Sequence, residues 1–119
     1  MLIEYTPKEF LTLRKTNPEY KDIYTMGVYI LYNQTKKKYY VGQSSNLFDR
    51  VFLHFNGRGN GDVYFDYKSG DIFSIRLYKF DPNQFRDLNE FEYHFIRIYE
   101  SNDTGYNRQA GNRTRQVSK

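Results

Sequence analysis

Two tyrosines, each in a triplet with a valine and a glycine, are the first residues in the chain that could do chemistry. Tyr29 closes the triplet GVY, and Tyr40 opens the triplet YVG. A phenol can give or take a proton, but its reference pKa of about 10 leaves only about one part in a thousand ionised at neutral pH. A tyrosine that acts as a base therefore needs a nearby positive charge or metal ion that favours the phenolate.

The segments that carry the two triplets should pair as a β-hairpin. Residues 26–33 and 38–43 are rich in Tyr, Val and Ile, and the polar stretch NQTKKK separates them. With a turn centred on residues 34–35, Tyr29 lies opposite Tyr40. Both phenols then share one face of the hairpin, about 5 Å apart at Cβ. A purely structural alternative stays open, because paired tyrosines also stabilise a sheet.

The same register places Gly27 opposite Gly42. Two glycines beside the phenols would leave the backbone bare, as happens where a ligand approaches closely. At this point a ligand site on the hairpin and a purely structural pairing both stay open.

A helix after the hairpin carries a cationic pair. The helix is expected to begin at Ser45, and its apolar residues recur at helical spacing: Leu47, Phe48, Val51, Phe52 and Phe55. Arg50 and His54 lie one turn apart on the side away from these residues, so both could face an anion. The structural alternatives are a surface arginine and a histidine that caps or packs the helix end. With a reference pKa near neutral, His54 would be an easier base than a phenol.

A single acidic residue falls inside an apolar helix face. The pattern predicts a helix over residues 87–100, with a core stripe of Leu88, Phe91, Phe95, Ile98 and Tyr99. At about 100° per residue, Glu92 falls within this stripe. A half-buried carboxylate is costly unless it meets a cation or a metal, although an ion pair with an arginine would serve equally well. Further on, Asn107 closes the turn signal GYN.

The rest of the chain predicts a small single domain. Residues 72–80 alternate as a third strand, and residues 62–70 fit either a helix or an extended piece. TPKE at 6–9 is a capping box that starts a short helix ending at Asn17-Pro18. We expect an N-terminal helical extension over 1–25, a folded unit over 26–107 and a basic, flexible tail over 108–119.

Composition narrows the partners and the metals. The chain has 119 residues, no cysteine and two histidines, so any metal should be hard and bound by oxygen. The net charge of +4 equals the charge of the tail, whose cationic residues are Arg108, Arg113, Arg115 and Lys119. With the triplet Lys36, Lys37 and Lys38, this pattern suits a polyanion, or is simply solvated charge. No apolar run approaches a membrane span and the start lacks a secretion signal, which predicts an intracellular, cytoplasmic protein.

Together, GVY, YVG, the arginine in QSSNLFDRVFLHF, the glutamate in EFEYHFI and the closing GYN resemble the GIY-YIG nuclease superfamily over residues 26–108. The resemblance implies a small α/β (α+β) fold, with a three-stranded antiparallel sheet flanked by helices and here an extra N-terminal helix. It implies a DNA endonuclease that uses one divalent ion, Mg²⁺ or Mn²⁺.

Carried over by position, the resemblance makes Glu92 the metal ligand and Arg50 the phosphate-contacting residue. Tyr29 becomes the expected base, with Tyr40 and His54 as assistants, and Asn107 the closing asparagine. Weaker contacts to the nucleic-acid backbone are expected from a further set: Gly42, Lys36, Lys37, Lys38, Arg108, Arg113 and Arg115.

The sequence departs from the family pattern in the short, glycine-rich segment GRGNGDVYFDYKSG, where family members usually carry a longer polar helix. RNA as a substrate and a homodimer that cuts both strands stay open. A protein that binds nucleic acid without cutting it, or a protein-interaction domain with exposed tyrosines, is the alternative function.

Overall fold

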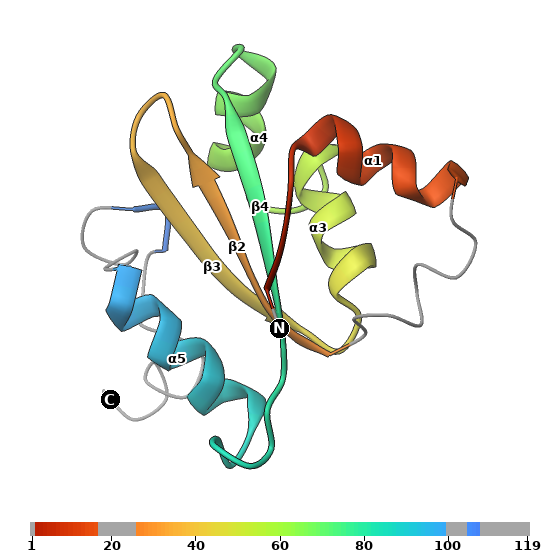
Figure 1. Ribbon diagram of the computed structural model, residues 1–119. Helices are drawn as coiled ribbons and strands as arrows, with labels where there is room; N and C mark the ends of the chain where they lie inside the picture. Colours follow the sequence, from red (N-terminus) through yellow and green to blue (C-terminus); the bar gives the residue numbers. More distant parts are fainter. Residues whose placement is uncertain (1, 17–25, 100–104, 108–119) are drawn as a thin grey trace.

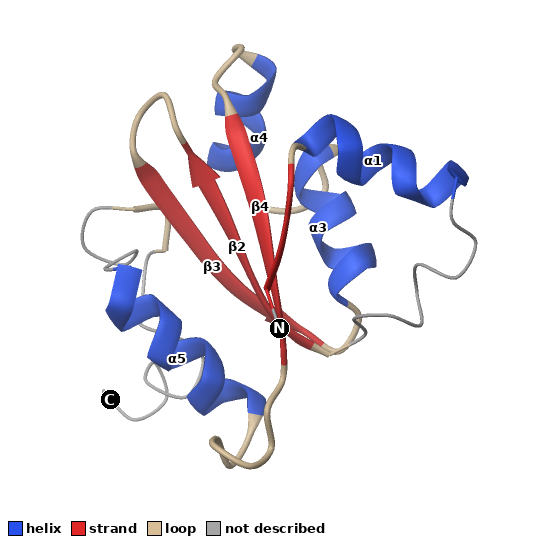
Figure 2. Cartoon of the chain, viewed as in Figure 1, coloured by secondary structure: helices blue, strands red, loops and turns tan. Residues whose placement is uncertain are grey.

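The computed structural model describes residues 2–16, 26–99 and 105–107, and it shows one antiparallel sheet between two helical layers (Figure 1). The sheet has four strands in the order β1-β4-β2-β3, and each neighbouring pair is antiparallel. The strands are β1 (Leu2–Tyr5), β2 (Gly27–Asn33), β3 (Lys38–Ser44) and β4 (Phe73–Lys79). The helices are α1 (Pro7–Thr16), α3 (Leu47–Phe55), α4 (Gly61–Lys68) and α5 (Leu88–Tyr99) (Figure 2).

The predicted mixed α/β fold with helices flanking an antiparallel sheet is confirmed, but the number of strands is wrong. Residues 2–5 form a fourth strand on the free edge of β4, with Ile3 opposite Leu77 and Tyr5 opposite Ile75. Four residues before a helix are too few to show an alternating pattern, which is why the sequence did not reveal this strand. The capping box after it is confirmed, since Thr6 N donates to Glu9 Oε1 (2.8 Å) and Glu9 N donates to Thr6 Oγ1 (3.1 Å).

The hairpin forms with a register shifted by two residues from the predicted one. Tyr29 lies opposite Gly42, and Leu31 lies opposite Tyr40. The turn takes four residues, 34–37, and Lys37 adopts a positive φ of 57°. A two-residue turn would require positive φ at both central positions, which Gln34 and the β-branched Thr35 disfavour. The two tyrosines still share a face, but as a diagonal pair.

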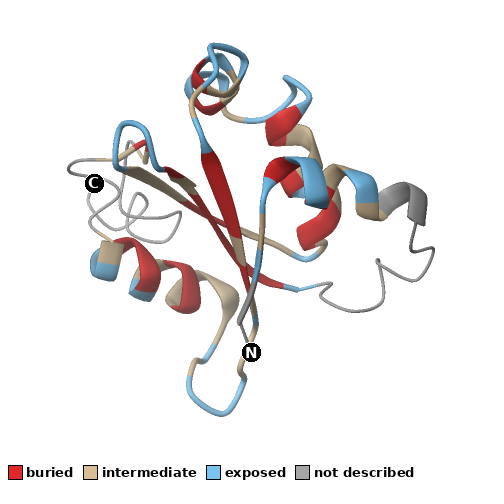
Figure 3. Ribbon diagram, turned by 45° about the horizontal axis from the view of Figure 1, so that its top comes forward, coloured by how far each residue is buried: buried red, intermediate tan, exposed pale blue. Residues whose placement is uncertain are grey.

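Each face of the sheet carries its own hydrophobic core (Figure 3). One core lies under α1, α3 and α4, and its largest fully buried members are Phe10, Leu31, Leu47, Phe48, Ile75 and Leu77. The other lies under α5 and contains Val28, Ile30, Val41, Phe91, Phe95 and Ile96. Alternation along β2 and β3 divides the residues between the two cores. Side chains of opposite parity on these strands therefore belong to opposite layers.

The expected core stripe of α5 needs one correction, because Ile98 is exposed (56%) while Ile96 is fully buried. The face that packs on the sheet is centred on Phe91, Glu92, Phe95 and Ile96. At about 100° per residue, Ile98 projects roughly 90° from the centre of this face. Glu92, by contrast, is buried as predicted.

The ambiguous segment after α3 is resolved as the helix α4, with Asn60 as its N-cap. The N-cap of α3 is Asn46, one residue later than expected. Among the described residues, no helix has the length and apolarity needed to cross a membrane.

Candidate active site

The candidate site is built around β3, with residues from both layers of the molecule. Tyr40 and Gly42 share the face under α3, while Val41 and Gln43 share the face under α5. Glu92 enters from α5, and Arg50 and His54 enter from α3. Burial is the main cause that raises the pKa of Tyr29 and of Tyr40. The negative charge of Glu92 raises both values further, and the positive charge of Arg50 opposes the rise. The groups therefore lie within electrostatic reach of one another.

Gly42 makes room for the phenol of Tyr29. A Cβ at residue 42 would stand 2.2 Å from both Cζ and Oη of Tyr29. A Cβ at Gly27 would likewise meet the carbonyl oxygen of Tyr78 at 2.0 Å. The prediction that these glycines leave the backbone bare for a ligand is therefore wrong, since protein atoms fill both spaces. The triplets are spaced so that one phenol can lie across the neighbouring strand.

His54 is buried, with 2% exposure, and it holds two hydrogen bonds. Asn60 N lies 2.8 Å from Nδ1, and the hydroxyl of Tyr29 lies 2.8 Å from Nε2. Because a backbone N–H can only donate, Nδ1 accepts, and the ring proton of the neutral imidazole sits on Nε2. Burial and the charge of Arg50 lower the pKa of His54 to about 4. The imidazole is therefore neutral near pH 7, and neither nitrogen has a free lone pair to act as the expected easy base.

The two phenols differ in how they face solvent. Tyr29 is 2% exposed, and burial raises its pKa well above the usual value. Tyr40 is only partly buried, and its ring centroid lies 6.2 Å from that of Tyr29. Burial also raises the pKa of Tyr40, but a hydrogen bond from Tyr29 and the charge of Arg50 oppose the rise. Of the two, Tyr40 is the phenol that can reach a bound molecule.

Arg50 is exposed and, among the described residues, takes part in none of the ion pairs. Its positive charge acts to lower the pKa of Tyr29, Tyr40 and His54, which supports a position near these side chains. A role at the surface alone stays the structural alternative. A planar, permanently charged group with no carboxylate partner suits a phosphate oxygen.

Glu92 is 7% exposed, and its hydrogen-bond partner is the amide of Gln43. Gln43 Nε2 donates to Glu92 Oε1 at 3.2 Å and to Asn89 Oδ1 at 2.5 Å. Burial raises the pKa of Glu92, and the Gln43 hydrogen bond partly offsets the rise. Within the described part of the chain, neither arginine nor lysine pairs with Glu92, so the alternative of an internal ion pair is not observed.

This carboxylate fits a hard divalent cation. Only one of its oxygens, Oε1, has a hydrogen-bond donor in the described structure, and a buried, unpaired carboxylate favours a cation. Over residues 2–16, 26–99 and 105–107, no cluster of three or more His, Cys, Asp or Glu could hold a metal ion. An ion at this place would therefore take its other ligands from water and substrate.

Asn107 lies at the outer edge of β3 and binds its backbone. Its Oδ1 accepts from Val41 N and its Nδ2 donates to Val41 O, both at 2.8 Å. The adjacent Tyr106 N donates to Tyr39 O at 2.8 Å. Residues 106 and 107 thus cover the free edge of the sheet beside Tyr40, and Asn107 holds the strand backbone at Val41. A catalytic role of Asn107 stays a prediction.

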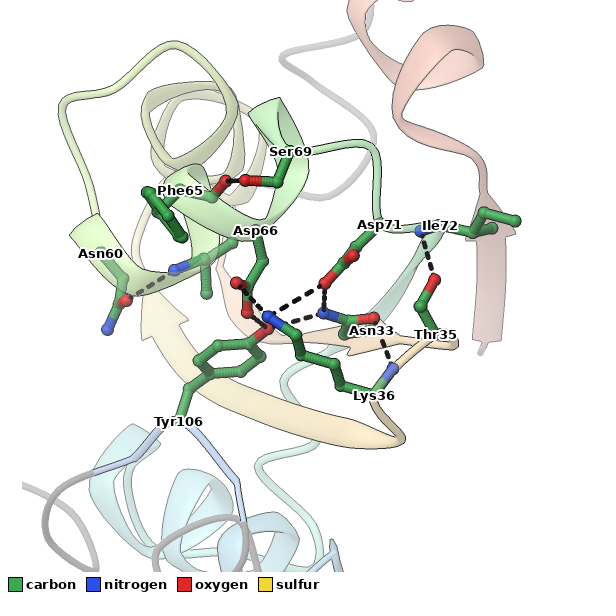
Figure 4. A network of polar contacts seen from close by, with 11 residues as sticks. Asn33, Thr35, Lys36, Asn60, Phe65, Asp66, Ser69, Asp71, Ile72 and Tyr106 are labelled. Carbon is green, nitrogen blue, oxygen red and sulfur yellow. Dashed lines mark hydrogen bonds and ion pairs between the residues drawn. The ribbon is translucent and has the colours of Figure 1, made fainter.

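The lysine triplet is divided among different environments. Lys36 Nζ binds Asp66 Oδ1 at 2.6 Å and lies 3.5 Å from Asp71 Oδ2 (Figure 4). Lys38 Nζ stands 4.5 Å above the ring of Tyr106. Lys37 is exposed at the turn. The expected phosphate contact stays a prediction for all three lysines, although Lys36 already has intramolecular partners. Arg108, Arg113 and Arg115 lie outside the described residues, as does the proposed tail.

Three residues of the site were not predicted from the sequence. Gln43 supports Glu92, and its only sequence signal is its position two residues after Val41, on the same face of the strand. Gly59 and Asn60 hold His54, and the glycine-rich loop offered no signal for that role.

Comparison with known proteins points to a single family. A family model described as the GIY-YIG catalytic domain matches residues 25–107. Among solved structures, the chain is similar to the catalytic domain of intron endonuclease I-TevI in a mutant form. That similarity has a TM-score of 0.55 and 21% sequence identity, and it covers 73% of this chain and 96% of the other. No curated protein matches the chain.

Proposed function

The chain belongs to the GIY-YIG catalytic domain family, and from this membership we propose that it is a metal-dependent endonuclease that hydrolyses phosphodiester bonds in DNA. The observation that carries the proposal is the state of Glu92. This carboxylate is buried, is held by Gln43, forms no ion pair with a described lysine or arginine, and acts electrostatically on both phenols. A buried acid of this kind is expensive to keep unless it serves a ligand.

In this proposal, Glu92 and water molecules hold one Mg²⁺ or Mn²⁺ together with the scissile phosphate. When bound, the ion would act as a Lewis acid that neutralises charge on the phosphate and makes a bound water more acidic. Arg50 binds the phosphate oxygens and stabilises the negative charge that develops during the reaction, a role worth several kcal/mol for well-placed donors elsewhere, typically about 3–4.

The geometry favours Tyr40, and not Tyr29, as the residue that first loses its proton to solvent and then, as a phenolate, takes a proton from the attacking water. Tyr29 Oη accepts from His54 Nε2–H, which leaves its own proton free to turn toward Tyr40, whose ring centroid lies 6.2 Å from that of Tyr29. A phenolate at Tyr40 could then accept this proton in a hydrogen bond and lie within the field of Arg50. Ionising Tyr29 would place a charge on the more deeply buried oxygen, which burial opposes. Tyr29 then stabilises the base instead of acting as one.

The test is the nicking of supercoiled plasmid in Mg²⁺ or Mn²⁺ by the wild type and by Glu92→Gln and Arg50→Ala. The wild type should convert supercoiled DNA to open circles, and each variant should lose about 10²-fold or more of the rate. Matched controls are Glu90→Gln, on the same helix and paired with Arg86 at 3.7 Å, and Arg97→Ala, which is exposed on the last turn of α5. Both controls should nick at close to the wild-type rate.

Two results would reject the proposal. Nicking that Glu92→Gln and Arg50→Ala retain in full would show that another agent cuts the DNA. Binding to plasmid without nicking, in either metal, would favour a nucleic-acid-binding protein on the same scaffold.

A further inference from the structure

We propose that the glycine-rich loop between α3 and α4, residues 56–60, is a positioning element of the active site. Through the N–H of Asn60 and the bare Cα of Gly59, it holds His54 in the tautomer that carries its proton on Nε2. This inference rests on the proposed nuclease function and assigns a role in it to a loop outside the residues proposed to bind metal and phosphate.

The loop backbone packs directly on the imidazole. A Cβ at Gly59 would stand 2.4 Å from His54 Nδ1 and 2.8 Å from His54 Cα. The next amide, Asn60 N, lies 2.8 Å from Nδ1. A side chain at residue 59 would therefore separate the donor from the ring.

The loop is anchored at both ends, so its amide has a fixed direction. Arg58 N donates to Leu53 O at 2.9 Å, which ties the loop to the last turn of α3. Asn60 Oδ1 accepts from Val63 N at 3.0 Å, which caps α4. Asn60 is the N-cap of α4, so its backbone amide immediately precedes the helix. The capped helix keeps this N–H directed at the imidazole of His54.

The tautomer decides the direction of the hydrogen bonds that follow. With Nδ1 accepting, Nε2–H donates to Tyr29 Oη, and the Tyr29 proton is free to go to Tyr40. With the proton on Nδ1, Nε2 would accept from Tyr29, and Tyr40 would lose its donor. The loop thereby determines whether a Tyr40 phenolate is stabilised.

The groups that face the imidazole from other elements are consistent with this direction of the hydrogen bonds. Tyr29 and Tyr40 contact it with ring centroids at 5.3 and 5.1 Å, and Arg50 approaches from the same helix. Neither a carboxylate nor a carbonyl among the groups resolved around this ring offers Nδ1 an acceptor. The backbone amide is thus the group that selects the tautomer.

The first test compares Asn60→Pro with Asn60→Ala by ¹⁵N NMR of the histidine ring in the full chain. Asn60 has a φ of −70°, which proline can adopt, and this variant removes the N–H. Proline Cδ would take the place of the amide hydrogen against Nδ1, so the variant also displaces the imidazole from the loop. Both variants lose the side-chain cap of α4, and only the proline loses the donor. The wild type and Asn60→Ala should show Nε2–H with an unprotonated Nδ1, and Asn60→Pro should shift toward the Nδ1–H form.

The second test compares Gly59→Ala with Gly61→Ala, because a Cβ at Gly61 has nothing within 4 Å. Gly59→Ala should disturb the ring signals of His54 and Gly61→Ala should not. In plasmid nicking, Asn60→Pro should be slower than Asn60→Ala by about tenfold or more, since an oriented base contributes about 10²–10⁴-fold.

The ¹⁵N signals of the His54 ring report on the loop whether or not the chain cuts DNA. The positioning role of the loop and the nuclease function can therefore be rejected independently. An Nδ1–H tautomer in the wild type would overturn the inference. So would identical ring signals in Asn60→Pro and Asn60→Ala, or equal effects of alanine at residues 59 and 61.

Discussion

At the residue scale, the close approach of Tyr29 to Gly42 explains why one triplet ends in glycine. The phenol reaches across β3 over a position that has no side chain, and there it meets His54 and Tyr40. A family signature that reads as two separate triplets is therefore one packing unit, in which the second glycine accommodates the first tyrosine.

Gly42→Ala should both destabilise the fold and slow nicking. Its Cβ would lie 2.2 Å from the buried phenol, and the backbone of β3 and the packed Tyr29 have little room to move, so about 1–3 kcal/mol of stability should be lost. Urea unfolding of this variant against Gly61→Ala measures the cost. Equal midpoints for the two variants would contradict the packing role.

His54 should make stability depend on pH in mild acid. Because its pKa falls to about 4 in the folded state, the unfolded chain binds more protons between about pH 6.5 and that value. The stability contributed by the neutral ring is thus present above about pH 6.5 and is lost as pH falls toward 4. Unfolding free energies from pH 7 to 4 should drop by roughly 2–3 kcal/mol more in the wild type than in His54→Gln. Parallel curves for the wild type and His54→Gln would show that burial does not shift the titration of His54.

The sequence identified candidate site residues, whose roles in a reaction stay predictions, and it did not indicate how these residues contact one another. Arg50, Glu92 and the tyrosines were recognised from type and spacing, and the structure brings them into electrostatic contact. The role of His54 could not be predicted, because its burial depends on a loop backbone six residues away. Asn107 was recognised, yet its hydrogen bonds to Val41 could not be foreseen from a turn signal.

At the scale of elements, a polar network ties the hairpin turn to α4 and to the segment 105–107 (Figure 4). Asp66 accepts from Lys36 Nζ at 2.6 Å and from the Tyr106 hydroxyl at 2.5 Å. Asn33 Nδ2 donates to Tyr106 Oη and to Asp71 Oδ2 at 2.8 and 2.7 Å. Because residues 106 and 107 cover the edge of β3, this network also fixes the strand that carries Tyr40.

Asp66→Asn should weaken this network at neutral pH. Burial tends to raise the pKa of Asp66, but hydrogen bonds from Lys36 and Tyr106 prevail and lower it below 3.8. The stabilisation is therefore present above that value and is lost as pH falls through the lower, folded-state pKa. We expect a loss of about 2 kcal/mol at pH 7 by urea unfolding, with a smaller difference in strong acid.

The control for this prediction is Asp62→Asn, on the exposed first turn of the same helix, where a few tenths of a kcal/mol are expected. A neutral-pH cost at Asp66 no larger than the cost at Asp62 would show that the network contributes little.

Element type was easier to predict than element register. The periodicities of β4, α3 and α5 gave the correct class and nearly the correct bounds, because each has a buried face with a clear repeat. The hairpin register depended on a turn of four residues whose last residue, Lys37, has positive φ, and no glycine or asparagine marks that position. The strand β1 is defined by its pairing with β4 and not by its own pattern.

At the scale of the molecule, each chain presents one proposed site, formed where α3 and α5 approach β3 from opposite layers. One site with one phosphate-binding arginine should cut one strand at a time. Open circles should therefore accumulate before linear plasmid appears. Linear product from the start would indicate two copies acting together.

The most direct test of the central claim combines metal dependence with the chemistry of the cut ends. Water attack at phosphorus with a departing 3′ oxygen leaves a 3′ hydroxyl and a 5′ phosphate, which DNA ligase can reseal. We predict open circles from the wild type only with Mg²⁺ or Mn²⁺, full resealing by ligase, and almost no product from Glu92→Gln. Nicks formed in EDTA, ends that ligase cannot join, or undiminished cutting by Glu92→Gln would contradict it.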